Sequence, residues 1–300
     1  MLVANGVSGA TLAVGAEATM QVGFSPQAAG LRAAELEIPS SDPLTNPLRI
    51  GLVGMGRERA TVDLSSGSDP SRAGAAVGFT VQVSGEILAP ADGQVTIVAS
   101  TGESCTDDTI DSQSGLTAVF SCPIAFETLG PRDVSATFSA STSHDGGPST
   151  SILQRVMRVA DVRVTATNGV AQVAPGTLLA YDVQVRNPGP DPAPGTELAV
   201  VVGPALDGMA WTCTPVGSAS CPEASGIGEV ALTVDLPVGA GLDVAFGGSV
   251  PPGDGTVWLV LQAEATVNAA APDHVHDPEP GNNVAEDIDL LTALFADGFE

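Results

Sequence analysis

The sequence predicts an all-β protein built from tandem antiparallel β-sandwiches. Along most of the 300 residues, apolar side chains alternate with polar ones, which is the pattern of strands that bury one face. The 35 glycines and 23 prolines suit many short strands joined by turns. At roughly 100–200 residues per domain, the length indicates two or three such units.

The charge of the chain argues against two classes of partner. Ten arginines, no lysine and 35 acidic residues give a formal net charge of −25. Nucleic acids and anionic membrane surfaces both require a cationic face, so neither is expected as a partner. The hydrophobic content of 43% and the mean hydropathy of +0.24 predict a folded chain rather than a disordered one.

No membrane span is expected either. The most apolar late stretch, residues 256–267, contains Gln262 and Glu264 and is shorter than the roughly 18 apolar residues that a span requires. The first basic residue is Arg32, so the charged start of a secretory signal peptide is not visible. If the protein is exported, we expect residues before Met1 or another export route.

Residues 1–56 contain only about three alternating runs, 20–24, 34–38 and 48–52. A sandwich has about seven strands, so we expect a module truncated at its N-terminus. The segment resembles the bacterial choice-of-anchor D domain, an Ig-like sandwich, which implies a structural or anchoring role without catalytic residues. The matching motifs are Val22-Gly23-Phe24-Ser25-Pro26, Ala28-Ala29-Gly30, Ser41-Asp42-Pro43 and Leu52-Val53-Gly54-Met55-Gly56.

After a linker predicted at 54–59, residues 61–158 contain about seven short alternating runs separated by turns, the pattern of a complete sandwich. The segment resembles the bacterial Ig-like repeat family, which implies an extracellular adhesin, a spacer or an enzyme-accessory region. The matching motifs are Thr61-Val62-Asp63-Leu64, Gly78-Phe79-Thr80-Val81-Gln82-Val83, Gly93-Gln94-Val95-Thr96-Ile97 and Ala136-Thr137-Phe138.

A second linker is predicted near 155–160, and residues 160–290 form a third series of alternating runs. The series resembles the domain of unknown function eleven, an Ig-like repeat of bacterial and archaeal surface proteins. The matching features are the Asn187-Pro188-Gly189-Pro190 turn, the Trp211-Thr212-Cys213 strand and the loop at 277–283. Pro188 departs from the family's Asn-Asn-Gly-Pro pattern and removes a backbone donor at that strand end. Residues 291–300 are expected to be a C-terminal tail.

The four cysteines fall as one pair in each of the two complete modules. Cys105 and Cys122 are 17 positions apart (122 − 105), and Cys213 and Cys221 are eight apart (221 − 213). Neither pair has Cys-x-x-Cys spacing with a nearby histidine, so two local disulfides are favoured over zinc or free thiols. Disulfides persist in oxidising compartments, which predicts a secreted or cell-surface protein.

The loop from Asp273 to Asp289 is rich in oxygen ligands. Ca²⁺ takes six to eight of them, so the loop holds a candidate calcium site. The EF-hand spacing is absent, and a proline-braced turn entering the last strand accounts for the same residues without a metal. Calcium is therefore the one cofactor that the sequence leaves open. The candidate ligands are Asp273, Asp277, Glu279, Asn282 and Asn283.

Catalytic residues are not identified. His274 and His276 would share a face on a strand and could chelate a metal, but no third ligand is visible. His144 is expected in a hairpin-like turn, and no Gly-x-Ser-x-Gly elbow marks a serine nucleophile. Tyr181, Trp211 and Trp258 could form a sugar-stacking platform, but they alternate with aliphatic residues and are interpreted as core.

The chain ends with two exposed-looking phenylalanines. This ending resembles a Phe-x-x-Asp-Gly-Phe-Glu tail that recurs on exported proteins of some gammaproteobacteria, which implies a sorting or docking tag. A frayed terminus is the alternative. The residues concerned are Phe295, Asp297, Gly298, Phe299 and Glu300.

Together these observations predict a non-catalytic extracellular or cell-surface segment, structural or adhesive, that is monomeric within a longer chain. Its partner would be a surface protein or a polysaccharide. The alternative is an accessory carbohydrate- or protein-binding region of a larger secreted enzyme.

Overall fold

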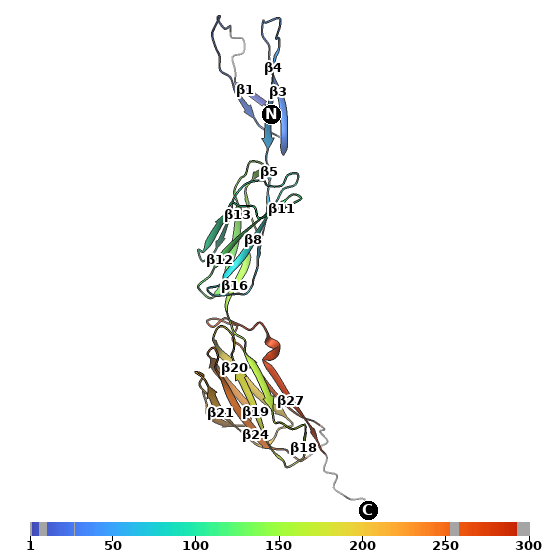
Figure 1. Cartoon of the computed structure of the whole chain (residues 1–300), viewed down its shortest axis with the longest axis vertical. Coiled ribbons are helices and arrows are strands. Elements are labelled where there is room, and N and C mark those ends of the chain that lie inside the picture. The colour runs from blue at the N-terminus through green and yellow to red at the C-terminus, as the bar shows by residue number, and fades with distance from the viewer. Residues whose placement is uncertain (1, 6–10, 27, 253–257, 293–300) are drawn as a thin grey trace, which may run out of the picture. The chain divides into compact units, whose positions relative to one another are not determined.

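The computed structural model (Figure 1) describes residues 2–5, 11–26, 28–252 and 258–292. Within them the chain is all-β, and the single helical element is the short 3-10 turn η1, Pro280–Asn282. The chain divides into two compact units. The first contains residues 1–69, 76–125 and 131–154, and the second contains residues 70–75, 126–130 and 155–300.

The N-terminal segment forms two separate two-stranded antiparallel sheets. One pairs β1 (Leu2–Asn5) with β2 (Gln21–Phe24), and the other pairs β3 (Gly30–Ile38) with β4 (Leu48–Gly56). Alternation places Leu36 opposite Ile50 and Ile38 opposite Leu48, so one face of the second sheet is apolar. Leu48 and Ile50 nevertheless remain exposed. Within the described residues this segment is not a closed sandwich.

The rest of the first unit is a sandwich of two antiparallel sheets. One sheet has the order β11-β12-β8-β6, and the other pairs β9 with β10 and β13, with β15 added at one end of β13. Alternating residues of β8, from Val77 to Val83, are buried, as are Val95 and Ile97 of β9. Across the sheets, the rings of Phe120 and Phe138 lie 6.1 Å apart between centroids. The bounds are β6 Thr61–Ser66, β8 Ala76–Ser84, β9 Val95–Ala99, β10 Ser104–Asp107, β11 Ser112–Ser114, β12 Thr117–Ala125, β13 Gly130–Phe138 and β15 Gly147–Pro148.

The second unit is a sandwich of two five-stranded sheets with the orders β17-β19-β24-β21-β22 and β18-β27-β25-β20-β23. Their inner faces meet in one core that includes Tyr181, Phe246, Leu198 and Leu261. Short parallel pairings attach β7 (Ser71–Arg72) and β26 (Val275–His276) to β16 (Ile152–Val159). The sheet bounds are β17 Arg163–Thr167, β18 Gln172–Val173, β19 Leu178–Arg186, β20 Ala193–Gly203, β21 Asp207–Val216, β22 Ser225–Ile227, β23 Val230–Leu236, β24 Gly241–Ser249, β25 Trp258–Thr266 and β27 Val284–Leu291.

Both predicted linkers consist largely of strand residues. β4 continues to Gly56, and β5 (Glu58–Arg59) pairs in parallel with β14 (His144–Asp145). The main-chain N–H of Glu58 also donates to the carbonyl of Ser143 at 3.0 Å. Near 155–160, β16 continues to Val159. The composition of both stretches resembles a linker, but long-range pairing fixes them as strands.

Both predicted disulfides are present, and the described residues contain no free cysteine. Cys105 in β10 and Cys122 in β12 join the two sheets of the first sandwich. Cys213 in β21 bonds Cys221 in the turn that follows, at the edge of one sheet of the second sandwich. One bond thus fastens sheet to sheet, and the other fastens a turn to its own strand.

Removing the disulfides should therefore have unequal effects. A bond closing 17 residues stabilises by about 3 kcal/mol on the chain-entropy estimate, against about 2.5 kcal/mol for eight residues. We expect Cys105→Ser/Cys122→Ser to lower the denaturant midpoint of the first unit more than Cys213→Ser/Cys221→Ser lowers that of the second. Equal midpoints for wild type and the first double variant would contradict this.

Candidate functional site

The candidate calcium residues lie where β26 leads into β27. Asp277, Glu279, Asn282 and Asn283, which we call the acidic turn, surround η1 between these strands. Asp277 is buried, and its Oδ1 accepts a hydrogen bond from the main-chain N–H of Glu279 at 2.9 Å. Its Oδ2 accepts one from the N–H of Val162 at 2.8 Å. Asp277 therefore braces the turn against the start of the sandwich.

Asp161, which the sequence analysis missed, belongs to this group. Asn282 Nδ2 donates to Asp161 Oδ1 at 3.0 Å and lies 3.5 Å from Glu279 Oε2. The hydrogen bond from Arg163, with a smaller one from Asn282, outweighs burial and lowers the pKa of Asp161. Asp161 raises the pKa of Arg163, and the charges of Glu279 and Asp277 add to that effect. Asp161 precedes Asn282 by 121 positions, so no local spacing could have indicated the contact.

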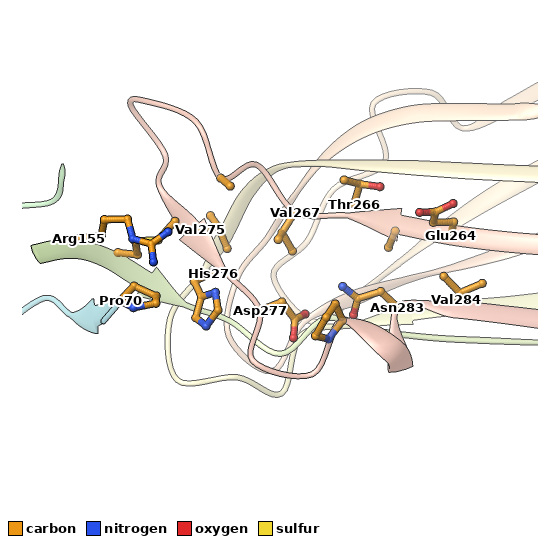
Figure 2. A pocket seen from close by; sticks show the side chains of 14 residues that line it. Pro70, Arg155, Glu264, Thr266, Val267, Val275, His276, Asp277, Asn283 and Val284 are labelled. Atoms are coloured by element: carbon orange, nitrogen blue, oxygen red, sulfur yellow. The ribbon is translucent and has the colours of Figure 1, made fainter. Parts of the chain in front are cut away.

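A cavity of about 430 Å³ lies beside the acidic turn. Asp277, Asn283, His276 and Arg155 are among the residues that line it (Figure 2). The walls are largely apolar. They include Met157, Val267, Val275, Pro280 and Val284.

Not every predicted ligand joins this group. Asp273 Oδ2 accepts from Asn268 Nδ2 at 3.0 Å, so a different partner holds it. Within the described ranges no group of three or more His, Cys, Asp or Glu side chains is arranged to hold a metal ion. A cation at the acidic turn would therefore need the amide oxygens as well. His274 and His276 do not share a strand face, because β26 begins at Val275 and His274 has a left-handed φ of 46°.

The first unit contains a buried polar group around His144. His144 lies in the connection between the antiparallel strands β13 and β15, and its side chain is fully buried. Its Nε2 lies 2.9 Å from Glu58 Oε1, and its Nδ1 lies 2.8 Å from Ser143 Oγ. Ser143, His144 and Glu58 are all less than 9% exposed, and they do not line the cavity beside the acidic turn. The group holds a loop.

Glu58 is the acceptor for that loop. Its carboxylate receives the main-chain N–H groups of Glu86, Ile87 and Leu88 at 2.8–3.0 Å. Burial acts to raise the pKa of Glu58, but these three hydrogen bonds and the charge interaction with His144 together lower it. The charged, buried carboxylate of Glu58 therefore holds the main chain of residues 86–88 in place.

The three aromatic residues divide between core and surface. Tyr181 and Trp211 are buried, as predicted, and Tyr181 donates from its hydroxyl to Asp289 Oδ2 at 3.0 Å. Trp258 is 52% exposed, so the core interpretation is wrong for it. Leu259 and Leu261 take the inward positions of β25, and alternation then turns Trp258 outward.

Two further predictions concern the chain as a whole. The described part of the chain has no helix long and apolar enough to cross a membrane. The sorting-tail residues Phe295, Asp297, Gly298, Phe299 and Glu300 lie outside the described residues.

No protein-family model matches this sequence, and no curated protein matches it. Similar solved structures include Escherichia coli alpha-2-macroglobulin activated by porcine elastase, at 12% identity and a TM-score of 0.26, which covers 93% of this chain and 26% of that one. The fibronectin(III)-like modules of Clostridium thermocellum CbhA are 10% identical with a TM-score of 0.30, and the match covers 80% of this chain and 100% of that one. The Yersinia pseudotuberculosis adhesin InvE is 14% identical with a TM-score of 0.26, and the match covers 80% of this chain and 62% of that one.

The chain thus spans about a quarter of the macroglobulin and under two thirds of the adhesin. At these identities and TM-scores the comparisons carry nothing about activity, and the strand pairing above is what establishes the Ig-like sandwich fold. The three specific family resemblances stay predictions.

Replacing Glu58 should change how stability depends on pH. Because the folded state lowers the pKa of Glu58 below its reference value of 4.5, the charged form stabilises the fold above that pH. This contribution is lost as the pH falls through the lower folded-state pKa. We expect Glu58→Gln to lower the free energy of unfolding by about 3 kcal/mol at neutral pH. We also expect the unfolding free energy of this variant to fall less steeply than that of wild type as the pH is lowered. If urea titrations at acidic pH gave the same pH dependence of the unfolding free energy for the variant and wild type, this role of Glu58 would be contradicted.

Gly85 should tolerate no side chain. A Cβ there would collide with the carbonyl oxygen of Leu88, Glu58 Oε1 and His144 Nε2, whereas one at Gly78 would meet open space. We expect Gly85→Ala to lower the free energy of unfolding by about 1–3 kcal/mol. The matched control Gly78→Ala should change it by less than about 1 kcal/mol. Equal melting temperatures for the two variants would be inconsistent with the packing described.

Proposed function

We propose that this chain is a non-catalytic segment of an exported protein, in which Ig-like modules act as a spacer or an adhesive stalk. The observation that carries the proposal is the presence of one disulfide inside each sandwich. Such bonds persist in oxidising compartments outside the cytosol. The formal net charge of −25, without any lysine, gives a surface that resists self-association and supports a monomeric segment in a longer chain.

The polar groups of the candidate sites also support a structural role. Glu58 and His144 are enclosed and bonded to loop atoms, and Asp277 holds main-chain N–H groups. A catalytic acid or base must reach a substrate within hydrogen-bond distance, and these atoms face the protein's own backbone. These groups therefore hold the loops in their conformations.

A second candidate function is that of an accessory binding region of a larger secreted enzyme, with a polysaccharide or a surface protein as its partner. The observation that favours it is the half-exposed Trp258 on β25, because aromatic rings stack on sugars. Retention on insoluble polysaccharide that is lost in Trp258→Ala would favour this role over the stalk.

Localisation and thiol state together test the main proposal. An antibody against the whole chain should label intact, unpermeabilised source cells or detect the protein in their medium. In the protein recovered without reductant, all four cysteines should resist alkylation until a reductant is added. Recovery from the cytosol with four reactive thiols would contradict the proposal, and turnover of ester or glycoside substrates by the purified chain would contradict its non-catalytic part.

A further inference from the structure

The outward face of the sheet β18-β27-β25-β20-β23 carries a group of apolar side chains. Leu259, Leu261 and Asp289 occupy inward positions of β25 and β27 and are buried. Their neighbours along each strand therefore point outward, because side chains alternate between the two faces of a sheet. The apolar members of this outward set, which we call the outer patch, are Val201 of β20, Trp258 and Val260 of β25, and Ile288 and Leu290 of β27.

Strand register brings the residues of the outer patch together. Trp258 is directly opposite Leu290, and Val260 is directly opposite Ile288. On the other side of β25, Val260 is opposite Gly203, where a Cβ would meet nothing within 4 Å. Trp258 is 52% exposed and Ile288 is 51% exposed. Contiguous exposed apolar side chains mark a contact surface, whereas single ones are ordinary.

A second copy of this chain fits the outer patch poorly. In the described residues, the five strands of this sheet contain no arginine, lysine or histidine. Glu197, Glu264 and Glu286 are exposed on the outward face. Two identical faces would therefore place carboxylates against carboxylates, and like charges across an interface are unfavourable.

The C-terminal end of the chain begins beside the outer patch. Thr292 is the last described residue, and its N–H and its hydroxyl both donate to the carbonyl of Val173, at 2.8 and 3.1 Å. Eight residues follow, 293–300, which we call the tail. The tail can span at most about 29 Å, whereas Ile288 lies only about 13 Å of strand before Thr292. Trp258 and Ile288 are thus both within its reach.

The tail also carries side chains that can cover the patch. Leu294, Phe295 and Phe299 are large and apolar. Burying them against Trp258 would remove apolar surface from water on both sides of the contact. A tethered segment reaches the patch at a high effective concentration. Each phenylalanine whose burial is described is at most 1% exposed, namely Phe79, Phe120, Phe126, Phe138 and Phe246.

We propose that the tail docks on the outer patch of the same molecule, with Leu294, Phe295 and Phe299 against Trp258 and Ile288. The tail also contains Asp297 and Glu300, which the acidic sheet repels. The contact is therefore apolar, and added NaCl should strengthen it by screening that repulsion. The proposal is independent of the proposed function, because it concerns only how the end of this chain packs.

Acrylamide quenching of tryptophan fluorescence tests the proposal. The chain contains two tryptophans, and Trp211 is only 5% exposed, so quenching reports mainly on Trp258. The full chain is compared with a chain that ends at Ala293. We expect the shortened chain to have a quenching constant higher by about twofold, because its indole ring at 258 is uncovered. In a Trp258→Phe background the two lengths should be quenched equally.

Substitutions then separate the tail from the patch. Phe295→Ser/Phe299→Ser should raise the quenching constant as the truncation does, whereas Asp297→Asn/Glu300→Gln keeps the apolar side chains and should not raise it. Once Ile288→Ser has removed the docking surface, the truncation should have no further effect. The matched control is Ile227→Ser, which replaces an isoleucine that is 88% exposed on β22 of the opposite sheet. In that variant the truncation should act as in wild type.

Three results would overturn the proposal. The first is an equal quenching constant for the full and shortened chains, both folded by circular dichroism. The second is protection of Trp258 that depends on protein concentration, which would mean that a second copy covers the patch. The third is protection that NaCl removes, because an apolar contact between two acidic segments cannot be weakened by screening.

Discussion

Buried carboxylates that accept main-chain N–H groups are the interaction on which the loops of both units depend. A chain with ten arginines and no lysine cannot pair its 35 acidic residues with cations. Where a carboxylate is buried, backbone donors therefore take the place of a counter-ion, and a buried charge without such partners would be costly. The buried instances are Glu58 with residues 86–88 and Asp277 with Val162 and Glu279. The half-buried Asp191 and Asp287 accept main-chain N–H groups of Val159 and Asn168 in the same way, and Asp191 also pairs with Arg72.

This arrangement links the composition of the chain to its proposed role. Each sandwich closes around an apolar core, and one disulfide lies in each. Buried carboxylates hold loops in both units. Most of the other acidic residues are exposed or half-buried, whereas Asp289, which accepts from the Tyr181 hydroxyl, is fully buried. A rigid, anionic, disulfide-bonded module suits a spacer outside the cell.

The sequence predicts what depends on local pattern. Period two in β8 and β25 identifies strands and their buried faces, and one cysteine pair per module predicts both disulfides. It does not predict what depends on distant partners. Glu58 lies in a stretch that resembles a linker, yet His144, 86 positions later (144 − 58), pairs with it. Asp161 is equally remote from the turn that it joins, and pattern alone does not set the exposure of a strand's first residue, as at Trp258.

The pKa values of Glu58 and Asp191, measured by ¹³C NMR titration of their carboxyl carbons, test the central interaction most directly. For Asp191, burial acts to raise the pKa, but hydrogen bonds from Arg72 and the N–H of Val159 outweigh it. The account predicts that Glu58 titrates below 4.5 and Asp191 below 3.8, their reference values. Titration of either group above its reference value would mean that the carboxyl is buried in its neutral form. Carboxylates would then not be what holds the loops.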